Sequence, residues 1–207
     1  MEKTYVILAG GYLDVKTISI PENAAVICAD KGYLAAKELG LDNVLVLGDF
    51  DSLGFIPKSS DVQIYPSKKD DTDTLLAVKE ALKMGASKIF IYGALGGRID
   101  HTFANIQTLM FIAENGALGT LVSDENMVTL QTSNTCRRYK RHDGYYFSVF
   151  SYSEKSTGVN INGTEYTLSD AVLTNNYPLG VSNHITNDYA EVSVRDGCLI
   201  IIESKEI

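Results

Sequence analysis

Cysteines and long apolar runs are both scarce in this 207-residue chain. The three cysteines, Cys28, Cys136 and Cys198, are too few and too scattered for a disulfide framework, and no CxxC pair occurs. This usage favours a reducing compartment. The apolar run at residues 5–9 is too short for a signal peptide, and no other run is long enough to span a bilayer. We therefore expect a soluble, cytoplasmic protein with no membrane partner.

Positive charge is the next deficit. Lys and Arg total 18 against 26 Asp and Glu, which leaves a formal net charge of −8. A chain this acidic is a poor candidate for sequence-independent nucleic-acid binding, which needs a basic surface. A small anionic ligand is compatible with it, because a divalent metal can bridge carboxylates to phosphates. The hydrophobic fraction of 45% and the charged fraction of 21% are those of a globular protein and exclude a largely disordered chain.

Short apolar runs alternate with helical patterns in the first part of the chain. The runs that predict strands cover residues 5–9, 24–29, 43–47 and 89–92. The patterns that predict helices cover residues 33–39, 72–84 and 99–114, the last with Ile99, Phe103, Ile106, Met110 and Ala113 on one apolar face. Continuous apolar strands are typical of a parallel sheet covered by helices. We predict an α/β domain, with a mostly parallel sheet and flanking helices, over residues 1–130.

The pattern changes after about Ser123. Short alternating segments follow at residues 145–150, 159–161, 171–174, 189–194 and 199–202. The Asp196-Gly197 pair between the last two segments predicts a β-hairpin. We interpret the polar stretch 134–143 as a linker or an exposed turn. Residues 131–207 are expected to form a small antiparallel β domain.

Two aspartates follow the third predicted strand. Asp49 and Asp51 leave the carboxyl end of an apolar run, which is the edge at which open α/β sheets bind ligands. Paired carboxylates at that edge suit Mg²⁺, a hard cation that takes oxygen ligands and often bridges to substrate phosphates. The alternative is a polar turn in which an Asp caps the next segment.

A run of charged residues opens the second predicted helix. Residues 68–73 read Lys-Lys-Asp-Asp-Thr-Asp. Acids and Thr72 in the first turn of a helix suit capping and the helix dipole, so a capped helix start is one interpretation. Four charged residues before Thr72 exceed what a cap needs, however. Asp73 could therefore join the two aspartates above around one metal, and Lys68 and Lys69 could face phosphate.

Glycines separate the last predicted strand of this domain from its last helix. The nine residues that end at His101 read Gly-Ala-Leu-Gly-Gly-Arg-Ile-Asp-His. Such a loop exposes backbone N–H groups at the positive end of a helix, which suits phosphate. Gly96 and Gly97 would supply the amides, and Arg98 adds a planar donor fork. A tight strand–helix turn also accounts for the glycines, and Asp100 with His101 can cap the helix, bind metal or move a proton.

Four further residues are weaker candidates. Asp30 ends the second predicted strand, where its carboxylate can accept a hydrogen bond from a nucleotide or hold the start of a helix. In the second half of the chain, Tyr166 offers an aromatic face, and Ser182 and Asn183 offer hydrogen-bonding groups. By composition alone, these last three belong to turns or to a core.

Taken in order, these segments resemble the thiamine pyrophosphokinase family. The matching pieces are Ala-Asp-Lys-Gly at 29–32, Gly-Asp-Phe-Asp-Ser at 48–52, Lys-Asp-Asp-Thr-Asp at 69–73, the glycine-rich loop at 93–101, Gly-Thr-Glu-Tyr-Thr-Leu at 163–168 and Gly-Val-Ser-Asn at 180–183. The resemblance implies an α/β nucleotide-binding domain, a β-sandwich domain that binds thiamine, and a homodimer. It also implies transfer of a pyrophosphoryl group from ATP to the hydroxyethyl group of thiamine, which gives thiamine diphosphate and AMP.

The resemblance also assigns roles to individual residues. Asp49, Asp51 and Asp73 match the family's Mg²⁺-site carboxylates. Thr72, Arg98 and Asp100 match ATP-site positions, and Asp30, Gly96 and Gly97 are expected ATP contacts beside them. Tyr166, Ser182 and Asn183 match thiamine-side positions. Tyr166 stands where animal members carry Trp, a change that keeps an aromatic face but loses area.

The mechanism that this resemblance implies needs little covalent chemistry from the protein. Mg²⁺ would bridge phosphate oxygens, and Arg98 with the glycine amides would stabilise charge as the thiamine hydroxyl attacks the β-phosphorus. Asp73, Arg98 and Asp100 are the expected catalytic residues, and the proton acceptor is left open between the two aspartates.

One alternative is a haloacid-dehalogenase-like phosphatase with Asp49 as nucleophile, although its motif belongs on a first strand and not a third. A non-catalytic nucleotide sensor is the other.

Overall fold

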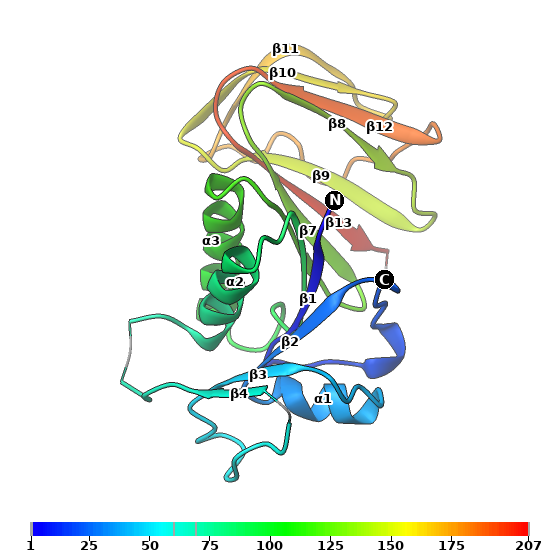
Figure 1. Cartoon of the computed structure of the whole chain (residues 1–207). Helices are drawn as coiled ribbons and strands as arrows, with labels where there is room; N and C mark the ends of the chain where they lie inside the picture. The colour runs from blue at the N-terminus through cyan, green and yellow to red at the C-terminus, as the bar shows by residue number, and fades with distance from the viewer. Residues whose placement is uncertain (1, 60, 69, 207) are drawn as a thin grey trace. The chain divides into compact units, whose positions relative to one another are not determined.

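The chain folds into two compact units, Met1–Asp124 and Glu125–Ile207 (Figure 1). The computed structural model describes residues 2–59, 61–68 and 70–206, so Lys69, expected to face phosphate, lies outside the described residues. The division falls next to the change of sequence pattern at Ser123. Residues 125–130, which the sequence places in the first domain, lie in the second unit.

Among the described residues of the first unit, six parallel strands form a sheet, in the spatial order β4, β3, β2, β1, β5, β6. Their bounds are β1 (Thr4–Leu8), β2 (Ala25–Ala29), β3 (Leu45–Gly48), β4 (Asp61–Ile64), β5 (Lys88–Tyr92) and β6 (Leu118–Val122). The central strand β1 has no solvent exposure at Val6, Ile7 and Leu8. This burial explains why its sequence is continuously apolar and confirms the predicted parallel sheet. The strands β4 and β6 were not predicted.

Three helices connect these strands: α1 (Gly32–Glu38), α2 (Asp73–Lys83) and α3 (Ile99–Glu114), with a short 3₁₀ helix η1 (Val15–Thr17). All three lie where the sequence predicts helices. The buried face of α3 is not the predicted one, because Ile99 is 84% exposed and Phe103 is 61% exposed. The buried face instead carries Leu109 and Ile112, whose side chains pack over Gly119 of β6. A Cβ on Gly119 would lie 2.7 Å from Leu109 and 2.9 Å from Ile112, so this glycine lets the helix approach the strand.

Two antiparallel layers form the second unit. One layer has the order β7 (Asn126–Gln131), β13 (Leu199–Lys205), β9 (Tyr145–Ser151). The other has the order β11 (Leu168–Thr174), β10 (Lys155–Asn162), β12 (Tyr189–Val194), β8 (Thr135–Lys140). Phe147 and Leu199 from the first layer share one buried core with Val159 and Val192 from the second. A core enclosed between two sheets is the defining feature of a β-sandwich, which confirms the predicted class of this domain.

The stretch 134–143 is not the linker that the sequence predicts, because it contains the strand β8. Burial alternates along β8, so that Arg137 and Tyr139 are half-buried while Arg138 is exposed. The half-buried guanidinium of Arg137 donates to the Leu130 carbonyl oxygen at 2.8 Å. In the sequence alone, the charge of Arg137 argues against a buried strand face. The hydrogen bond compensates the partial burial of this guanidinium.

The predicted hairpin at Asp196-Gly197 is also wrong. β12 pairs with β8 and β10, whereas β13 pairs with β7 and β9, so this turn carries the chain from one layer of the sandwich to the other. The turn rests on Thr157, whose N–H donates to the Asp196 carbonyl oxygen at 2.9 Å and whose carbonyl oxygen accepts from the Asp196 N–H at 3.2 Å. These bonds to β10 replace the cross-strand bonds of a hairpin.

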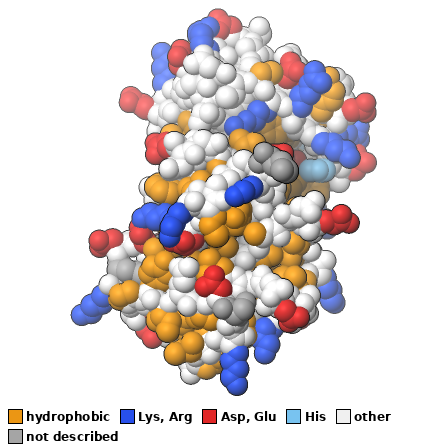
Figure 2. All heavy atoms as spheres, viewed as in Figure 1, with side chains coloured by type: hydrophobic (Ala, Val, Ile, Leu, Met, Phe, Trp, Pro, Cys, Tyr) orange, Lys and Arg blue, Asp and Glu red, His pale blue; other side chains and the backbone are white. Residues whose placement is uncertain are grey.

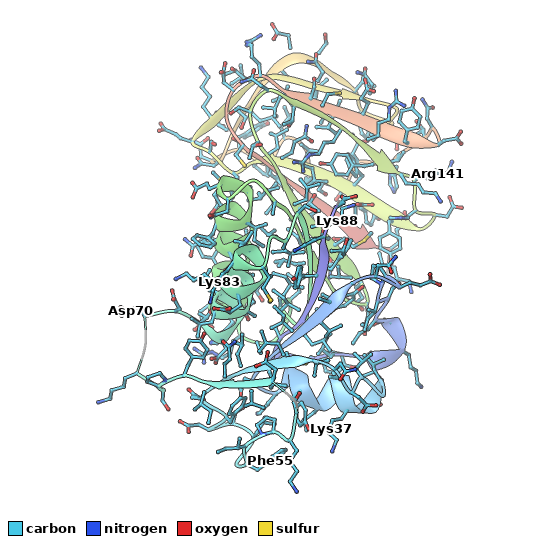
Figure 3. The ribbon with its side chains drawn as sticks, in the orientation of Figure 1. Lys37, Phe55, Asp70, Lys83, Lys88 and Arg141 are labelled. Atoms are coloured by element: carbon cyan, nitrogen blue, oxygen red, sulfur yellow. The ribbon has the colours of Figure 1, made fainter. Side chains whose placement is uncertain are left out.

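Charged side chains of both signs are interspersed on the face shown in Figure 2. In the first unit, Phe55 and Lys37 project outward from the ribbon (Figure 3). Phe55 is 51% exposed, and Ile56 beside it is 61% exposed. Within the described ranges, no helix combines the length and the apolar character that crossing a membrane requires.

Candidate active site

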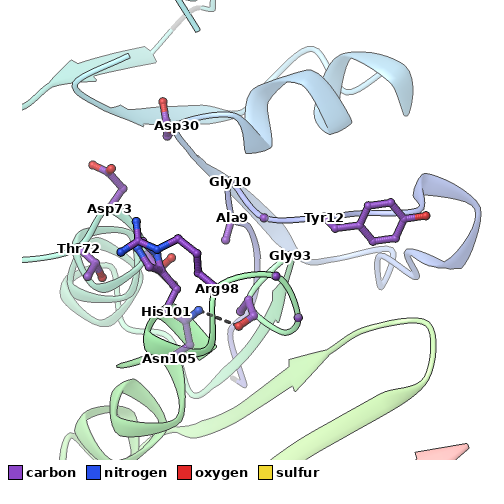
Figure 4. Close-up of a pocket in the computed structure, with 15 residues that line it drawn as sticks. Ala9, Gly10, Tyr12, Asp30, Thr72, Asp73, Gly93, Arg98, His101 and Asn105 are labelled. Atoms are coloured by element: carbon purple, nitrogen blue, oxygen red, sulfur yellow. Dashed lines mark hydrogen bonds between the residues drawn. The ribbon is translucent and has the colours of Figure 1, made fainter. Parts of the chain in front are cut away.

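A cavity of about 380 Å³ opens at the carboxyl ends of β1, β2 and β5 in the first unit (Figure 4). In the sheet, β2, β3 and β4 lie in turn on one side of β1, whereas the next strand in the chain, β5, lies on the other side of β1. Open α/β sheets bind ligands where the strand order reverses in this way. Candidate residues named from the sequence line the cavity: Asp30, Thr72, Asp73, Gly96, Gly97, Arg98 and His101. Asp100 is not among the described residues that line it. Figure 4 shows Thr72, Asp73 and Arg98 grouped on one side of it, with the Tyr12 ring pointing away.

The glycine-rich loop enters the cavity with a backbone that only glycine adopts readily. Gly96 has φ +83° and Gly97 has φ +64°, and a Cβ on either would meet no neighbouring atom. Backbone conformation rather than crowding therefore accounts for both glycines. The loop ends at Arg98, the N-cap residue of α3, which makes no side-chain capping hydrogen bond. The first turn of this 16-residue helix thus brings backbone N–H groups and a partial positive charge to the cavity.

Arg98 and Asp100 form a two-point ion pair beside this helix start. Arg98 Nε donates to Asp100 Oδ1 at 3.1 Å, and Nη2 donates to Oδ2 at 2.5 Å. Hydrogen bonding to Arg98 holds the pKa of the Asp100 carboxyl below its usual range, and the same contact raises the pKa of Arg98. Asp100 Oδ1 also accepts from the His101 N–H at 3.0 Å. A carboxylate stabilised in this way is a weak proton acceptor, and its position suits it to orient Arg98.

Thr72 and Asp73 form the start of α2. The Thr72 hydroxyl oxygen accepts from the Leu75 N–H at 3.1 Å, so the capped-helix interpretation of this segment is confirmed. Asp73 is the first helical residue, where the helix dipole favours a negative charge. Both residues line the cavity, which the capping role does not require.

Asp30 is held in an unusual conformation at the end of β2. Its φ of +50° lies in the left-handed region, which costs free energy for a residue other than glycine. Its N–H donates to the Leu47 carbonyl oxygen at 2.9 Å, and one carboxylate oxygen accepts from the Ser52 hydroxyl. The other oxygen, Oδ1, is buried and has no hydrogen-bond partner in the described part of the chain. The carboxylate does not cap α1, whose N-cap is Lys31 without a side-chain bond.

Asp49 and Asp51 fold into a polar turn after β3. Asp49 Oδ1 accepts from the Asp51 N–H at 3.0 Å, and Asp51 Oδ2 accepts from the Ser67 hydroxyl at 2.7 Å. Neither is among the described residues that line the cavity. Within the same described ranges, no three acidic, His or Cys residues are gathered closely enough to hold a metal ion. The polar-turn interpretation therefore describes this structure, in which the expected triad with Asp73 is not assembled.

These carboxylates nevertheless fit Mg²⁺ in chemical type. Each ionised carboxylate offers two oxygen atoms as ligands. β2 and β3 are neighbouring parallel strands, with Ala29 opposite Leu47, so Asp30 and Asp49 follow strand ends at the same sheet edge. The buried Asp30 Oδ1 lacks the partner that a cation or a hydrogen-bond donor would supply. Hard oxygen donors of this kind are those that Mg²⁺ takes in proteins.

The second unit brings Tyr166, Ser182 and Asn183 together. Tyr166 is 65% exposed, whereas Asn183 is only 7% exposed. The side chain of Asn183 accepts from the backbone N–H of Tyr166 and donates to its carbonyl oxygen, although the two residues are 17 positions apart. Ser182 is exposed and, like Asp30, has a left-handed backbone, with φ +55°. The ring of Tyr166 is thus accessible for stacking, whereas the amide group of Asn183 is largely inaccessible.

Sequence reasoning missed Asn105, which lies one turn after His101 on α3 and lines the cavity. Asn105 is 7% exposed, and its Nδ2 donates to the Ala94 carbonyl oxygen at 2.8 Å, the bond drawn in Figure 4. It therefore ties the glycine-rich loop to the helix. The available signal was a polar residue four positions after His101, a spacing that places both on one helical face.

Two family models match the chain. The model of the thiamin pyrophosphokinase catalytic domain matches residues 19–118, and the model of the thiamin pyrophosphokinase vitamin B1 binding domain matches residues 133–199. The chain is 29% identical to the thiamine pyrophosphokinase of Bacillus subtilis over 213 residues, which cover 99% of this chain and 100% of that protein.

Solved structures agree with these matches. The crystal structure of the Bacillus subtilis thiamine pyrophosphokinase superposes with a TM-score of 0.90 at 28% identity, covering 99% of this chain and 100% of that one. That of the Geobacillus thermodenitrificans protein gives a TM-score of 0.85 at 26% identity, covering 98% of each chain. The Candida albicans protein shares the fold, with a TM-score of 0.79 at 16% identity over 98% of this chain and 90% of that one. None of these similarities supports the haloacid-dehalogenase-like alternative.

Proposed function

This chain belongs to the thiamine pyrophosphokinase family, and we propose on that basis that it transfers the pyrophosphoryl group of ATP to thiamine, giving thiamine diphosphate and AMP. The observation that carries this proposal is the convergence of predicted ATP-site residues on one cavity, at the strand-order reversal of the sheet. That cavity lies within the part of the chain that the catalytic-domain model matches, apart from its short segment after β1.

The first unit is proposed to bind ATP. The amides of Gly96 and Gly97 and the first turn of α3 would face the phosphates, where the helix dipole favours negative charge. Arg98 would supply a planar donor fork, and Asp100 would keep that fork oriented. Asp30 and Thr72 would contact other parts of the nucleotide. The depressed pKa of Asp100 argues against this residue as the acceptor of the thiamine hydroxyl proton.

Asp49, Asp51 and Asp73 are proposed to hold Mg²⁺ once ATP has entered. When bound, Mg²⁺ supplies positive charge that neutralises the phosphates and the charge that develops during transfer. Asp49 and Asp51 lie in the turn that follows β3, and Asp73 lies at the cavity wall. Positioning by these side chains, and exclusion of competing water, are the contributions that the protein itself would make.

The second unit is proposed to bind thiamine, with the Tyr166 ring stacked on the ligand and the Ser182 hydroxyl available for a hydrogen bond. The exposed ring and the left-handed backbone at Ser182 support this assignment. We also propose a homodimer in the cytoplasm, on the family resemblance and on the cysteine usage. Light scattering coupled to size-exclusion chromatography tests the dimer directly.

Product analysis tests the activity. The purified chain is incubated with ATP, Mg²⁺ and thiamine, and nucleotides and thiamine species are separated by chromatography. We expect AMP and thiamine diphosphate in equal amounts. Release of phosphate from ATP without thiamine would support the phosphatase alternative, and formation of ADP with thiamine monophosphate would contradict pyrophosphoryl transfer. An Asp51→Asn preparation purified in parallel identifies activity that comes from a contaminating enzyme.

A further inference from the structure

The side chain of Asn183 is hydrogen-bonded to the protein backbone. Its Oδ1 accepts from the Tyr166 N–H at 3.0 Å and from the His184 N–H at 2.9 Å, and its Nδ2 donates to the Tyr166 carbonyl oxygen at 2.7 Å. A carboxamide has two acceptor lone pairs and two donor hydrogens. Both lone pairs and one hydrogen are therefore in use, on a residue that is 7% exposed. Little of this side chain is left for a ligand.

These hydrogen bonds hold the backbone of Tyr166 in place. It lies in the irregular segment between β10 and β11, outside any strand, so a sheet ladder does not hold its backbone. Asn183 bonds both its N–H and its carbonyl group, and the Thr164 hydroxyl donates to the same carbonyl oxygen at 2.9 Å. The backbone of Tyr166 is thus fixed while its ring is left accessible, with 65% of the residue exposed.

Asn183 is itself anchored to the sandwich. Its carbonyl oxygen accepts from the N–H of Phe147 in β9 at 2.7 Å, and the N–H of the preceding Ser182 donates to the Ser148 hydroxyl at 3.0 Å. The Glu165 N–H donates to the His184 carbonyl oxygen at 2.9 Å, which adds a backbone bond between the two loops. Asn183 therefore connects the rigid strand β9 to the loop that carries Tyr166.

We propose that Asn183 is a positioning residue for thiamine binding, which acts by fixing the direction in which the Tyr166 ring leaves the backbone. The sequence resemblance makes Asn183 a thiamine-binding residue, whereas the hydrogen bonds above favour an indirect role. Stacking between aromatic rings depends on their relative orientation, so a ring on a loosened loop binds a flat heteroaromatic ligand less tightly. This inference rests on the proposed function, in which Tyr166 stacks on thiamine.

A double-mutant cycle separates the two roles. The thiamine Kd of the full chain is measured by calorimetry for Asn183→Asp, Tyr166→Ala and the double variant. Asn183→Asp keeps the size and both acceptor positions but replaces the donor to the Tyr166 carbonyl with an oxygen. We expect each single change to weaken thiamine binding by about tenfold, and the double variant to bind no more weakly than Tyr166→Ala alone. Nucleotide binding should be unchanged in all three.

A spectroscopic readout follows ring mobility directly, because the chain contains no tryptophan. Tyr166→Trp introduces a single reporter, whose time-resolved anisotropy should show an added fast component when Asn183→Asp is combined with it. Asn176→Asp, a change at an exposed loop residue that accepts from the Thr174 hydroxyl at 2.8 Å, is the matched control and should leave the anisotropy unchanged. If Asn183→Asp unfolds the protein, as thermal unfolding would show, Asn183→Ser takes its place in both experiments.

The outcomes distinguish the proposals. Additive losses in the double variant would overturn the positioning role and show that Asn183 contacts thiamine itself. Unchanged affinity and anisotropy in a folded Asn183 variant would overturn it as well. If Tyr166→Ala leaves thiamine affinity unchanged while product formation persists, the enzyme activity stands. In that case the Tyr166 stacking site is wrong, and the positioning role falls with it.

Discussion

Arg98 and Asp100 hold each other through two parallel hydrogen bonds, from Nε to Oδ1 at 3.1 Å and from Nη2 to Oδ2 at 2.5 Å. Both side chains are largely exposed, so the pair contributes little to the stability of the fold. Its consequence is geometric, because two of the five guanidinium donors are fixed on Asp100 and the remaining donors take a defined direction. The residue that precedes α3 thus presents an oriented cation at the cavity.

Arg98→Lys keeps the positive charge and loses the planar fork. We expect kcat/KM for ATP to fall by at least about tenfold, because a lysine ammonium cannot hold Asp100 and a phosphate in the same arrangement. Excess Mg²⁺ should not restore the rate. Arg138→Lys is the matched control, because Arg138 also forms an exposed ion pair, with Glu191, but lies in the second unit. Equal activity of Arg98→Lys and wild type would remove Arg98 from the ATP site.

Asp100→Asn tests whether this carboxylate takes a proton. Its pKa is lowered from a usual value of 3.8 by the hydrogen bond from Arg98, so it is ionised throughout the range from about pH 5 to pH 9. The interaction with Arg98 is present above the usual pKa and is lost only as the pH falls through the lowered value. We expect Asp100→Asn to reduce kcat/KM and to leave the shape of its pH profile unchanged over that range. Disappearance of an acidic limb in the variant would identify Asp100 as the general base.

Asp30→Asn should separate stability from activity. An amide in place of the half-buried carboxylate removes a charge whose buried Oδ1 has no partner in the described structure, while an oxygen still accepts from Ser52. We expect the free energy of unfolding in urea to be unchanged or to rise by up to about 1 kcal/mol, and kcat/KM to fall by at least about tenfold. The exposed Asp61→Asn is the control for the loss of one negative charge. A destabilised and fully active variant would assign Asp30 to the fold alone.

Asp51→Asn addresses the metal. The amide oxygen can still accept from the Ser67 hydroxyl, so the turn after β3 should remain folded. At limiting Mg²⁺, turnover should fall by at least about tenfold, and the half-saturating Mg²⁺ concentration should rise, because one charged ligand is lost. Asp42→Asn, at an exposed position outside this turn, is the control and should match wild type. An unaltered Mg²⁺ dependence in Asp51→Asn would contradict its assignment as a metal ligand.

The three cysteines should differ sharply in reactivity. Burial raises the pKa of the Cys28 thiol to about 12 and that of Cys198 to about 11, whereas Cys136 is exposed on β8. The thiolate is the reactive form, so a disulfide reagent at about pH 8 should label Cys136 in the folded protein and all three thiols after unfolding. Cys136→Ser should abolish the fast reaction. Rapid labelling of that variant would mean that a buried thiol becomes accessible in the native state.

The features that depend on neighbours along the chain could be predicted from the sequence. The strands β1, β2, β3 and β5 are continuously apolar because both faces of the sheet are covered, and that pattern is legible without coordinates. The cap at Thr72 and the glycine turn before α3 follow from local hydrogen bonding and backbone freedom. The chemical types of the candidate site, carboxylates, a guanidinium and backbone amides, were therefore available from the start.

Local patterns predict the wrong structure where a contact with another element outweighs them. The polar sequence of β8, with two arginines, predicts a linker, yet Arg137 donates to the Leu130 carbonyl oxygen of β7. The buried face of α3 differs from the predicted one because Leu109 and Ile112 pack where Gly119 leaves space on β6. Hydrophobic periodicity cannot report a partner that lies elsewhere in the chain.

The sequence by itself determined which reactive groups this protein has, at which strand and helix ends, and to which family it belongs. Only the tertiary structure decided which of them meet. Asp30 meets Ser52 22 residues away, Asp51 meets Ser67 16 residues away, and Asn183 meets Tyr166 17 residues away. The physical reason is that such contacts depend on strand order, register and the fit of one loop against another. These are set by the packing of the whole domain, because the free energy of each contact includes the cost of bringing distant segments together.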